Sequence, residues 1–258
     1  MSAKRPLSAE QIVESILKSP KYRAIAPDAV RRIVGEEFAR TGGDCEKRAR
    51  NRLHQVADAF MNQAQQHALW ALMERRDVMG ALAQHASTRE RLANVDEYLA
   101  LIARHALKGE LICDAACGLN PLLLGNAGYD VLGLDIQLTC VDVINAWARL
   151  EGWRVSARGA DLVGCEALPE CGLTLMLKLL PVMDAQRAGE SMRLLMAARS
   201  PRVLVSFPTR TLGGRGVGME RNYSERFESG LPDVYEISER AVIGTELFYA
   251  LRRRGDSA

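Results

Sequence analysis

The chain has 258 residues, of which 48% are hydrophobic and 26% charged, and its net charge at pH 7 is +2. These values are typical of a soluble globular protein, and the length suits one large domain or an ordinary domain with a smaller one. No apolar run approaches membrane-spanning length, and the first residues, MSAKRPLSAEQ, lack the apolar region of a signal peptide. We therefore expect a cytoplasmic protein without a membrane partner.

Cysteines and histidines do not group in ways that would bind a metal. The six cysteines form no C-x-x-C pair, and the four histidines form no H-x-x-x-H pair or Cys/His cluster. We expect small buried thiols in a reducing compartment, and no metal site.

Apolar residues at helical spacing dominate the first 107 residues. The expected helices begin at or next to Ser8, Pro27, Asp44, Gln65 and either Ser87 or Thr88. Ser8 and Gln11 form the pattern of a capping box. Asp44 is expected to cap a long polar helix that runs towards Gln63, and another helix is expected over 65–85.

After residue 107 the pattern changes to short β-rich runs that alternate with helical windows. The runs lie at 111–115, 131–136, 154–157, 173–179, 203–207, 235–237 and 246–251. Alternating βα units predict a doubly wound α/β fold, and the short segment between the last two runs predicts an antiparallel hairpin. We expect two domains, a helical one over 1–107 and an α/β one over 108–258.

Two neighbouring strand ends carry the pattern of a nucleotide-cofactor site. ELICDAACGLNP (110–121) ends its apolar run at Asp114, and VLGLDI (131–136) ends at Asp135. An acid at the end of the second strand can accept both ribose hydroxyls of an adenosine. The turn has one glycine, Gly118, where a dinucleotide motif has three, and Asp114 would repel a phosphate.

S-adenosylmethionine combines an adenosine with an amino-acid tail and has no phosphate, so it fits this pattern better than a dinucleotide. GADL (159–162), after the third expected strand, offers Asp161 as an acceptor for the adenine amine and the N–H of Leu162 as a donor to the ring. Three acids at successive strand ends are jointly a stronger signal than one. The alternatives are a tight turn without a ligand and acids that only cap helices.

Two further segments flank this expected site. In HASTRERL (85–92), an arginine such as Arg91 could pair with the methionyl carboxylate, although a solvated helix start explains the same residues. LKLLP (177–181) ends the fourth strand, where nitrogen- and oxygen-directed methyltransferases hold the reacting atoms. Lys178 is a candidate for a cation near the target, and Asp184 either contacts the cofactor or caps the next helix.

Basic residues indicate a polyanionic partner. Residues 1–105 carry 17 Lys and Arg against 13 Asp and Glu, whereas the remainder carries 17 against 19. The residues form two clusters: Lys18, Lys21, Arg23, Arg31 and Arg32, and then Lys47, Arg48, Arg50, Arg52 and His54. Few aromatic residues accompany them, which favours phosphate and shape recognition of structured RNA over base stacking. The alternative is an ordinary solvated surface.

The loop SFPTRTLGGRGVGM (206–219) follows the fifth expected strand and combines four glycines with Arg210 and Arg215. Glycine N–H groups and arginine side chains together suit a phosphate backbone. The alternative is a mobile surface loop.

Taken in order, HASTRERL, DAACGLNP, GLDI, LKLLP, SFPTRTLGGRGVGM and GTELFY form a specific combination that covers nearly the whole chain. On these motifs the chain resembles the aminoglycoside-resistance 16S ribosomal RNA methyltransferases that modify N7 of a decoding-site guanine. The resemblance implies a class I (Rossmann-like) methyltransferase fold with a seven-stranded sheet. It also implies S-adenosylmethionine as methyl donor, and an N-terminal helical extension that docks on the assembled small ribosomal subunit.

The resemblance also assigns residues to roles. To the cofactor it assigns Arg91, Gly118, Asp135, Asp161 and Leu162, and it places His85, Ser87 and Thr88 in the same cofactor-side motif. The strand-end pattern adds Asp114, and Asp184 is a further candidate for a cofactor contact. To the 16S rRNA it assigns His54 and the neighbouring Arg48 and Arg52, and to the target strand Arg210 and the glycine loop, which includes Arg215. The basic clusters add Lys21 and Arg23. Similar proteins often have Glu where this chain has Asp184, which keeps the carboxylate but shortens the side chain by one methylene. Guanine N7 carries no proton, so we expect no general base, and Lys178 and Arg210 would position the target.

Three other functions compete with this interpretation: a nicotinamide-dependent oxidoreductase, a non-catalytic RNA-binding protein, and a methyltransferase for adenine N1 of the same decoding site. The single glycine and Asp114 disfavour the first. The residues alone do not separate guanine from adenine. Nothing in the sequence requires an oligomer, so we expect a monomer.

Overall fold

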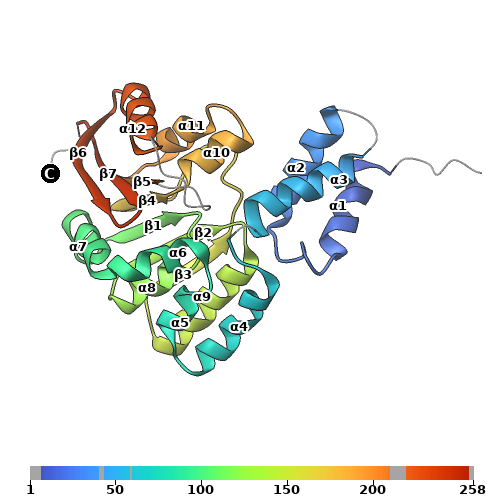
Figure 1. Ribbon diagram of the computed structural model, residues 1–258, viewed down its shortest axis with the longest axis horizontal. Helices are drawn as coiled ribbons and strands as arrows, with labels where there is room; N and C mark the ends of the chain where they lie inside the picture. The colour runs from blue at the N-terminus through green and yellow to red at the C-terminus, as the bar shows by residue number, and fades with distance from the viewer. Residues whose placement is uncertain (1–6, 41–43, 59, 210–218, 256–258) are drawn as a thin grey trace, which may run out of the picture.

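The computed structural model describes residues 7–40, 44–58, 60–209 and 219–255. These residues form a seven-stranded sheet in the order β3-β2-β1-β4-β5-β7-β6 (Figure 1). The strands are β1 Leu111–Ala115, β2 Asp130–Asp135, β3 Val155–Gly159, β4 Leu173–Leu177, β5 Arg202–Pro208, β6 Tyr235–Ile243 and β7 Glu246–Arg253. Strands β1 to β5 pair in parallel, whereas β7 is antiparallel to both β5 and β6. The predicted α/β class and the C-terminal hairpin are confirmed.

The order in which successive strands are added to the sheet reverses between β1 and β4. Strands β1, β2 and β3 are laid down towards one edge, and β4 and β5 lie on the other side of β1. All five side chains of β4, LTLML, are buried, as expected for a central strand covered on both faces. Open α/β sheets bind ligands at the carboxyl ends of their strands where the order reverses.

Helices cover both faces of the sheet (Figure 1). One hydrophobic cluster joins Trp147 of α9 (Leu138–Glu151) and Tyr98 of α7 (Val95–His105) to one face. The other cluster joins Leu194 of α11 (Glu190–Ala197) and Phe227 of α12 (Met219–Gly230) to the opposite face. The other helices of this part are α4 Gln63–Glu74, α5 Val78–Leu82, α6 Ala86–Arg91, α8 Asn120–Asn126 and α10 Leu180–Gln186, of which α4 packs on α9 and α5 on α8.

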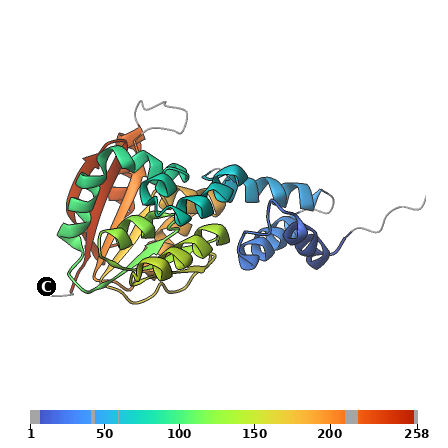
Figure 2. The same ribbon diagram turned by 90° about the horizontal axis from the view of Figure 1, so that it is seen from below.

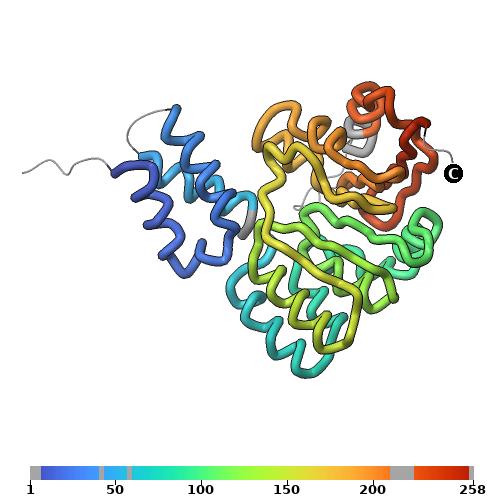
Figure 3. Tube along the Cα trace, turned by 180° about the vertical axis from the view of Figure 1, so that it is seen from behind, coloured from blue at the N-terminus to red at the C-terminus, as the bar shows by residue number. Residues whose placement is uncertain are grey.

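Three N-terminal helices form a lobe beside the sheet layers, visible in blue in Figures 2 and 3. They are α1 Ala9–Lys18, α2 Pro27–Arg40 and α3 Cys45–Leu53, and we call them the N-terminal lobe. The lobe has its own hydrophobic cluster, which includes Ile16, Ile33 and Leu53. The predicted capping box is present, because the Ser8 hydroxyl accepts from the Gln11 N–H and the Gln11 side chain accepts from the Ser8 N–H.

The predicted helices over 44–63 and 65–85 are wrong in their extent. α3 ends at Leu53 and is followed by a π-helical turn, and the next helix starts at Gln63 with Asn62 as its cap. Asp44 lies in the left-handed region and makes no side-chain capping bond. A break at Arg75–Asp77 separates α4 from α5, and Arg76 has a positive φ of 54°. These breaks let successive turns pack on different surfaces.

The hydrophobic packing divides the chain earlier than the boundary expected at residue 107. Apolar residues from Met61 to Ala106 belong to the same cluster as the sheet, whereas those up to Leu53 belong to the lobe's own cluster. The domain boundary at residue 107 stays a prediction. From the packing we propose that the separately packed N-terminal unit ends earlier, near the π-helical turn His54–Asp58. Within the described ranges, every helix is too short or too polar to serve as a membrane span.

A buried carboxylate holds α2 to α3 within the lobe. Glu37 is 3% exposed and accepts bonds from Arg48 Nε and Arg52 Nη1, each at 2.9 Å. Burial by itself would raise the pKa of Glu37, but the two arginines outweigh it and hold the pKa below its ordinary value. The side chains predicted to read rRNA at 48 and 52 therefore also tie the lobe together.

We expect the substitution Glu37→Ala to destabilise the lobe by about 2 kcal/mol. The arginines are 35% and 19% exposed, so the loss should stay below the roughly 3–5 kcal/mol of a fully buried pair. Hydrogen exchange of the α1–α3 amides measures this. The matched control is Asp28→Ala, which removes an exposed pair with Arg31 and should cost less than about 1 kcal/mol. Equal effects of the two substitutions would contradict the assignment.

Candidate functional site

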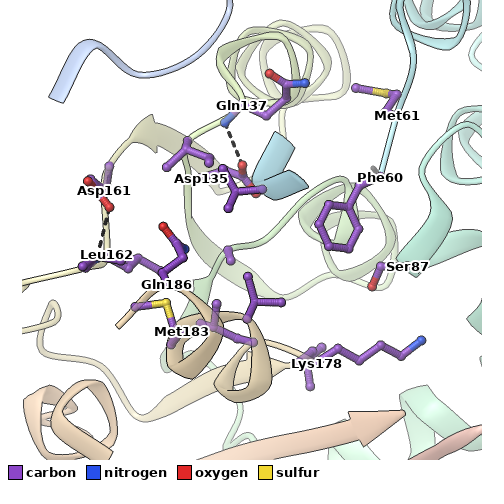
Figure 4. Close-up of a pocket in the computed structure, with 18 of the residues that line it drawn as sticks. Phe60, Met61, Ser87, Asp135, Gln137, Asp161, Leu162, Lys178, Met183 and Gln186 are labelled. Carbon is purple, nitrogen blue, oxygen red and sulfur yellow. Dashed lines mark hydrogen bonds between the residues drawn. The ribbon is translucent and has the colours of Figure 1, made fainter. Parts of the chain in front are cut away.

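A cavity opens at the carboxyl ends of β1, β2, β3 and β4, where the strand order reverses (Figure 4). Its lining includes Arg32, Phe60, Met61, His85, Ser87, Ala116, Asp135, Gln137, Asp161, Leu162, Leu177, Lys178, Met183 and Gln186. Figure 4 shows Asp135 between Gln137 and Asp161, with Phe60 on the opposite side. The cavity thus has an apolar body with a few polar groups, which is typical of a small-molecule site.

The turn after β1 brings backbone close to the second strand end. Ala116 and Gly118 have positive φ values of 54° and 52°. A Cβ on Gly118 would lie 2.6 Å from the His85 ring, so only glycine fits there. This close approach lets the Gly118 N–H donate to Asp135 Oδ2 at 2.7 Å.

Asp135 is held at the tip of β2 by backbone donors. Besides the bond from Gly118, its Oδ1 accepts from the Gln137 N–H at 2.8 Å. Burial raises the pKa of Asp135, and the donating N–H groups of Gln137, Gly118 and Ile136 oppose that shift. Each carboxylate oxygen keeps a lone pair available, so a vicinal diol in the cavity could donate to both.

Asp161 follows β3 and also lines the cavity. Its Oδ1 accepts from the Val163 N–H at 3.1 Å, which fixes the carboxylate against its own loop. The side chain of Arg32, from the N-terminal lobe, donates to both oxygens, at 2.6 and 3.2 Å. Leu162 lies buried next to it on the cavity wall.

Two buried polar atoms of the lining have no hydrogen-bond partner among the described residues. They are His85 Nδ1 and Gln137 Oε1. Burial lowers the pKa of His85 to about 4, and the neighbouring cations add to the shift, so the ring is neutral at pH 7. It stacks on Phe60 with 5.8 Å between ring centroids. Buried polar groups usually have partners, so both atoms point to a polar ligand in this cavity.

Asp114 lies behind the cavity rather than on its wall. It is 1% exposed, and its Oδ2 accepts from Asn120 Nδ2 at 2.7 Å. Burial raises its pKa to about 7, against the opposing effects of Asn120 and Arg91. Asp114 can therefore act on the cavity through its charge and through the turn, not by lining it.

The HASTRERL segment divides between cavity and core. His85 and Ser87 line the cavity, whereas Thr88 is buried and donates to the Leu82 carbonyl at 2.5 Å. Neither Ser87 nor Thr88 begins the helix as predicted, because α6 starts at Ala86 with His85 as its cap.

Arg91 is committed to a partner within the chain. Its Nε and Nη2 donate to the two oxygens of Glu246 at 2.9 and 2.8 Å, and the side chains are 6% and 3% exposed. Burial alone would raise the pKa of Glu246, but Arg91 and Lys178 outweigh it and lower the pKa. A buried guanidinium requires such a partner, and Arg91 is not among the residues that line the cavity. Its expected contact with a methionyl carboxylate stays a prediction.

Lys178 lies on the cavity wall at the end of β4. It has a positive φ of 55°, and its N–H donates to Ser206 Oγ at 3.0 Å. Its Nζ bonds Glu90 and lies 3.6 Å from Glu246 Oε2. These contacts hold the ammonium group at the cavity edge beside the Arg91–Glu246 pair.

Asp184 projects away from this cavity. Its oxygens accept from the N–H and hydroxyl of Ser191 at 3.0 and 2.7 Å, in the first turn of α11. Asp184 was expected either to contact the cofactor or to cap the next helix. The structure shows the contact with the next helix, and Asp184 is not among the residues that line the cavity.

The residues expected to contact rRNA fall into three groups. Arg48 and Arg52 take part in the Glu37 network, and Arg52 also donates to Glu36. Lys21, Arg23 and His54 are exposed on the lobe, with Lys21 Nζ 3.4 Å from His54 Nδ1. Arg210 and Arg215 lie outside the described residues.

Sequence reasoning missed several residues of the site. Phe60, Gln137, Gln186 and Glu246 were not assigned to it, and Arg32 was grouped with the basic residues expected to face RNA, whereas the structure pairs it with Asp161. Gln137 could have been found, because it lies two residues after a strand-end acid, and Glu246 lies in the GTELFY motif. Phe60 and Gln186 come from distant segments and carry no local signal. The described residues hold no group of three or more His, Cys, Asp or Glu side chains arranged for a metal ion.

Comparisons with known proteins agree with this geometry. The family described as "Ribosomal RNA methyltransferase (FmrO)" matches residues 18–250. A "16S rRNA (guanine(1405)-N(7))-methyltransferase" of Serratia marcescens is 42% identical, over 96% of this chain and 100% of its own length. A protein of the same name from Frankia casuarinae is 32% identical, over 95% of this chain and 94% of its own.

A solved structure extends the likeness to three dimensions. It is that of the 16S rRNA methyltransferase RmtF in complex with S-adenosyl-L-homocysteine, with a TM-score of 0.89 and 40% sequence identity. The match covers 98% of this chain and all of that one.

The raised pKa of Asp114 predicts a pH-dependent stability. Only the ionised form is penalised, so the penalty is absent below about pH 4 and complete above about pH 7, where stability is lowest. We expect Asp114→Asn to remove the penalty. Relative to the unsubstituted protein, the variant should gain on the order of 3 kcal/mol between pH 5 and pH 8. Urea unfolding at both pH values measures the gain, and parallel pH profiles of the two proteins would refute it.

Proposed function

The chain belongs to the FmrO family of ribosomal RNA methyltransferases, and from this membership we propose its reaction. It transfers the methyl group of S-adenosylmethionine to N7 of a 16S rRNA guanine, the one that the names of its relatives number 1405. The observation that carries the proposal is the cavity at the strand tips. It presents Asp135 and two unpartnered buried polar atoms to a small polar ligand.

The lining residues fit an adenosine with an amino-acid tail. Asp135 has lone pairs for the ribose hydroxyls, and Asp161 with Leu162 lies where the adenine would end. Phe60, Leu177 and Met183 supply the apolar surface for the ring. Of the other expected residues, His85 and Ser87 would face the ligand, whereas Asp114, Gly118, Thr88 and Arg91 would support the turn and helix behind it.

Bound S-adenosylmethionine supplies a methyl group on a sulfonium centre. Guanine N7 has an in-plane lone pair and no proton, so the chain has no proton to remove. Its task is to align the base and to exclude water. Lys178 would serve as a fixed cation at the cavity edge, because Glu90 and Glu246 hold its ammonium group in place. Neutral His85 would not repel the sulfonium group.

We propose that the N-terminal lobe docks on the small ribosomal subunit. Its exposed Lys21, Arg23 and His54 present positive or polar groups to phosphates. Arg48 and Arg52 add charge while they hold α2 to α3, and Arg210 and Arg215 would reach the target strand from the loop outside the described residues. We also propose that the chain acts as a monomer without a metal ion, on ribosomes in the cytoplasm.

The product gives a reason for drug resistance. Methylation at N7 adds a positive charge to the guanine ring, and a cationic aminoglycoside bound beside it would be repelled. We therefore propose that the modified subunit binds aminoglycosides less tightly.

Labelled-methyl transfer to three substrates tests the function. We expect incorporation with intact small subunits and at least about 100-fold less with naked 16S rRNA or free guanosine, because recognition requires the assembled shape. Mapping of the modified base should find a guanine N7 at the decoding site. Incorporation into an adenine, or equal activity on naked rRNA, would overturn the corresponding part of the proposal.

Calorimetry with S-adenosylhomocysteine tests the roles of individual residues. Asp135→Ala should weaken binding by at least about 100-fold, because two charge-assisted hydrogen bonds are lost. The control Asp142→Ala removes an exposed carboxylate from the following helix and should bind normally. Arg210→Ala should also bind normally but reduce methylation of subunits by at least about tenfold. The reverse pattern would reject the assignment of both sites.

A further inference from the structure

The N-terminal lobe touches the cavity through its backbone. The Ala26 N–H donates to the Ile136 carbonyl, and the Leu138 N–H donates to the Ala24 carbonyl, each at 2.7 Å. Between them, Ile25 and Gln137 form an isolated antiparallel bridge. The bridged segment begins one residue after Asp135. The lobe therefore acts as a short extra strand along the loop that donates to this carboxylate.

A second contact reaches the other end of the cavity. Arg32 lies on α2 and donates from Nε to Asp161 Oδ2 at 2.6 Å and from Nη2 to Oδ1 at 3.2 Å. Its Nη2 also donates to Gln186 Oε1 at 2.8 Å. The side chains of Arg32 and Asp161 are only 15% and 10% exposed. Arg32 itself belongs to the cavity wall.

Hydrogen bonds to the Asp161 carboxylate leave it little freedom to rotate. Two come from Arg32 and a third from the Val163 N–H, so three of about four acceptor positions are filled. A planar guanidinium fixes the plane of a carboxylate, which a lysine cannot do. One acceptor position remains, and its direction is set by a residue of the lobe.

A supporting ion pair joins the same elements. Glu36, one turn after Arg32 on α2, accepts from Arg187 Nη2 at 2.7 Å, just past the end of α10. Glu36 also accepts from Arg52 of α3 at 2.8 Å. The placement of α2 against the cavity therefore depends on the packing of the whole lobe.

We infer that Arg32 is a positioning residue that couples the N-terminal lobe to the adenine end of the cofactor site. Docking of the lobe on rRNA and binding of the cofactor are then thermodynamically linked. If one event orders α2 against Asp161, the other requires less ordering, and the effect is reciprocal. This inference rests on the proposed function, because it takes S-adenosylmethionine as the ligand of the cavity.

The linkage gives the lobe a role besides contact with rRNA. A basic residue of α2 would act on the cofactor and not on a phosphate. Its neighbour Arg31 differs, since it is 62% exposed and pairs with the exposed Asp28. The two adjacent arginines thus provide a matched pair for experiment.

Calorimetry with two ligands tests the coupling. S-adenosylhomocysteine carries the exocyclic amine, and S-inosylhomocysteine has an oxygen in its place. We expect Arg32→Ala to weaken binding of the adenosine ligand about tenfold and to reduce the preference for it over the inosine ligand. Arg32→Lys should be intermediate, and Arg31→Ala should match the unsubstituted protein.

Three outcomes would overturn the inference: unchanged binding by Arg32→Ala, an equal loss for both ligands, or a similar loss by Arg31→Ala. An equal loss would mean that Arg32 only supports the fold. If Arg32→Ala does not fold, the preference for the adenosine ligand over the inosine ligand can be measured with Arg32→Lys and Arg32→Gln. If the unsubstituted protein binds neither ligand, the proposed function fails first, so the two failures are distinguishable.

Hydrogen exchange tests the reciprocal half of the linkage. Addition of S-adenosylhomocysteine should slow exchange in α2 and over 136–138 in the unsubstituted protein and in Arg31→Ala, but not in Arg32→Ala. Equal protection of α2 in all three proteins would contradict the coupling.

Discussion

The carboxylate of Asp135 is the point on which the site depends. Its two oxygens accept from N–H groups on opposite sides, Gly118 in the turn after β1 and Gln137 in the loop after β2. The first bond requires a residue without a Cβ, because the His85 ring occupies the space. The second holds the loop that pairs with the N-terminal lobe. One buried acid thus joins the turn, the HASTRERL segment and the lobe.

A second buried charge network ties the helical segment before the sheet to its last strand. Arg91 of α6 meets Glu246 at the start of β7, and Lys178 at the end of β4 approaches the same carboxylate. The Ser206 hydroxyl also bonds Glu246. Removal of either Arg91 or Glu246 would leave the other charge buried without its main partner, which costs several kcal/mol. This explains why Arg91 is retained in the core although it does not line the cavity.

Local sequence features predicted most of the fold and part of the site. Six of the seven strand runs agree with the strands to within two residues, because burial produces apolar segments such as LTLML in β4. The run at 235–237 covers only the start of β6, whose remaining side chains are mostly exposed and carry no apolar signal. Asp135 and Asp161 were found because strand-end acids follow directly from strand position. The partner of Arg91 was not found, because Glu246 is 155 residues away and only the β5–β7 register brings it near. The break after Leu53 was missed because polar helical sequence continues beyond it.

The three strand-end acids have different surroundings, and this decides what each can do. Asp114 is buried in the core, where Asn120 is its hydrogen-bond donor among the described residues, and burial raises its pKa to about 7. Asp135 is surrounded by backbone N–H groups that do not titrate, and it keeps open lone pairs. Both oxygens of Asp161 accept from the guanidinium of Arg32, which belongs to the N-terminal lobe. The oxygens of a pyrophosphate are acceptors and would meet the acceptor oxygens of Asp135 and Asp161, whereas hydroxyl and amine donors would find acceptors there at fixed positions. The remaining acceptor position of Asp161 is oriented by Arg32 of the lobe, so in the proposed complex the carboxylate that meets the adenine amine is also one that attaches the lobe.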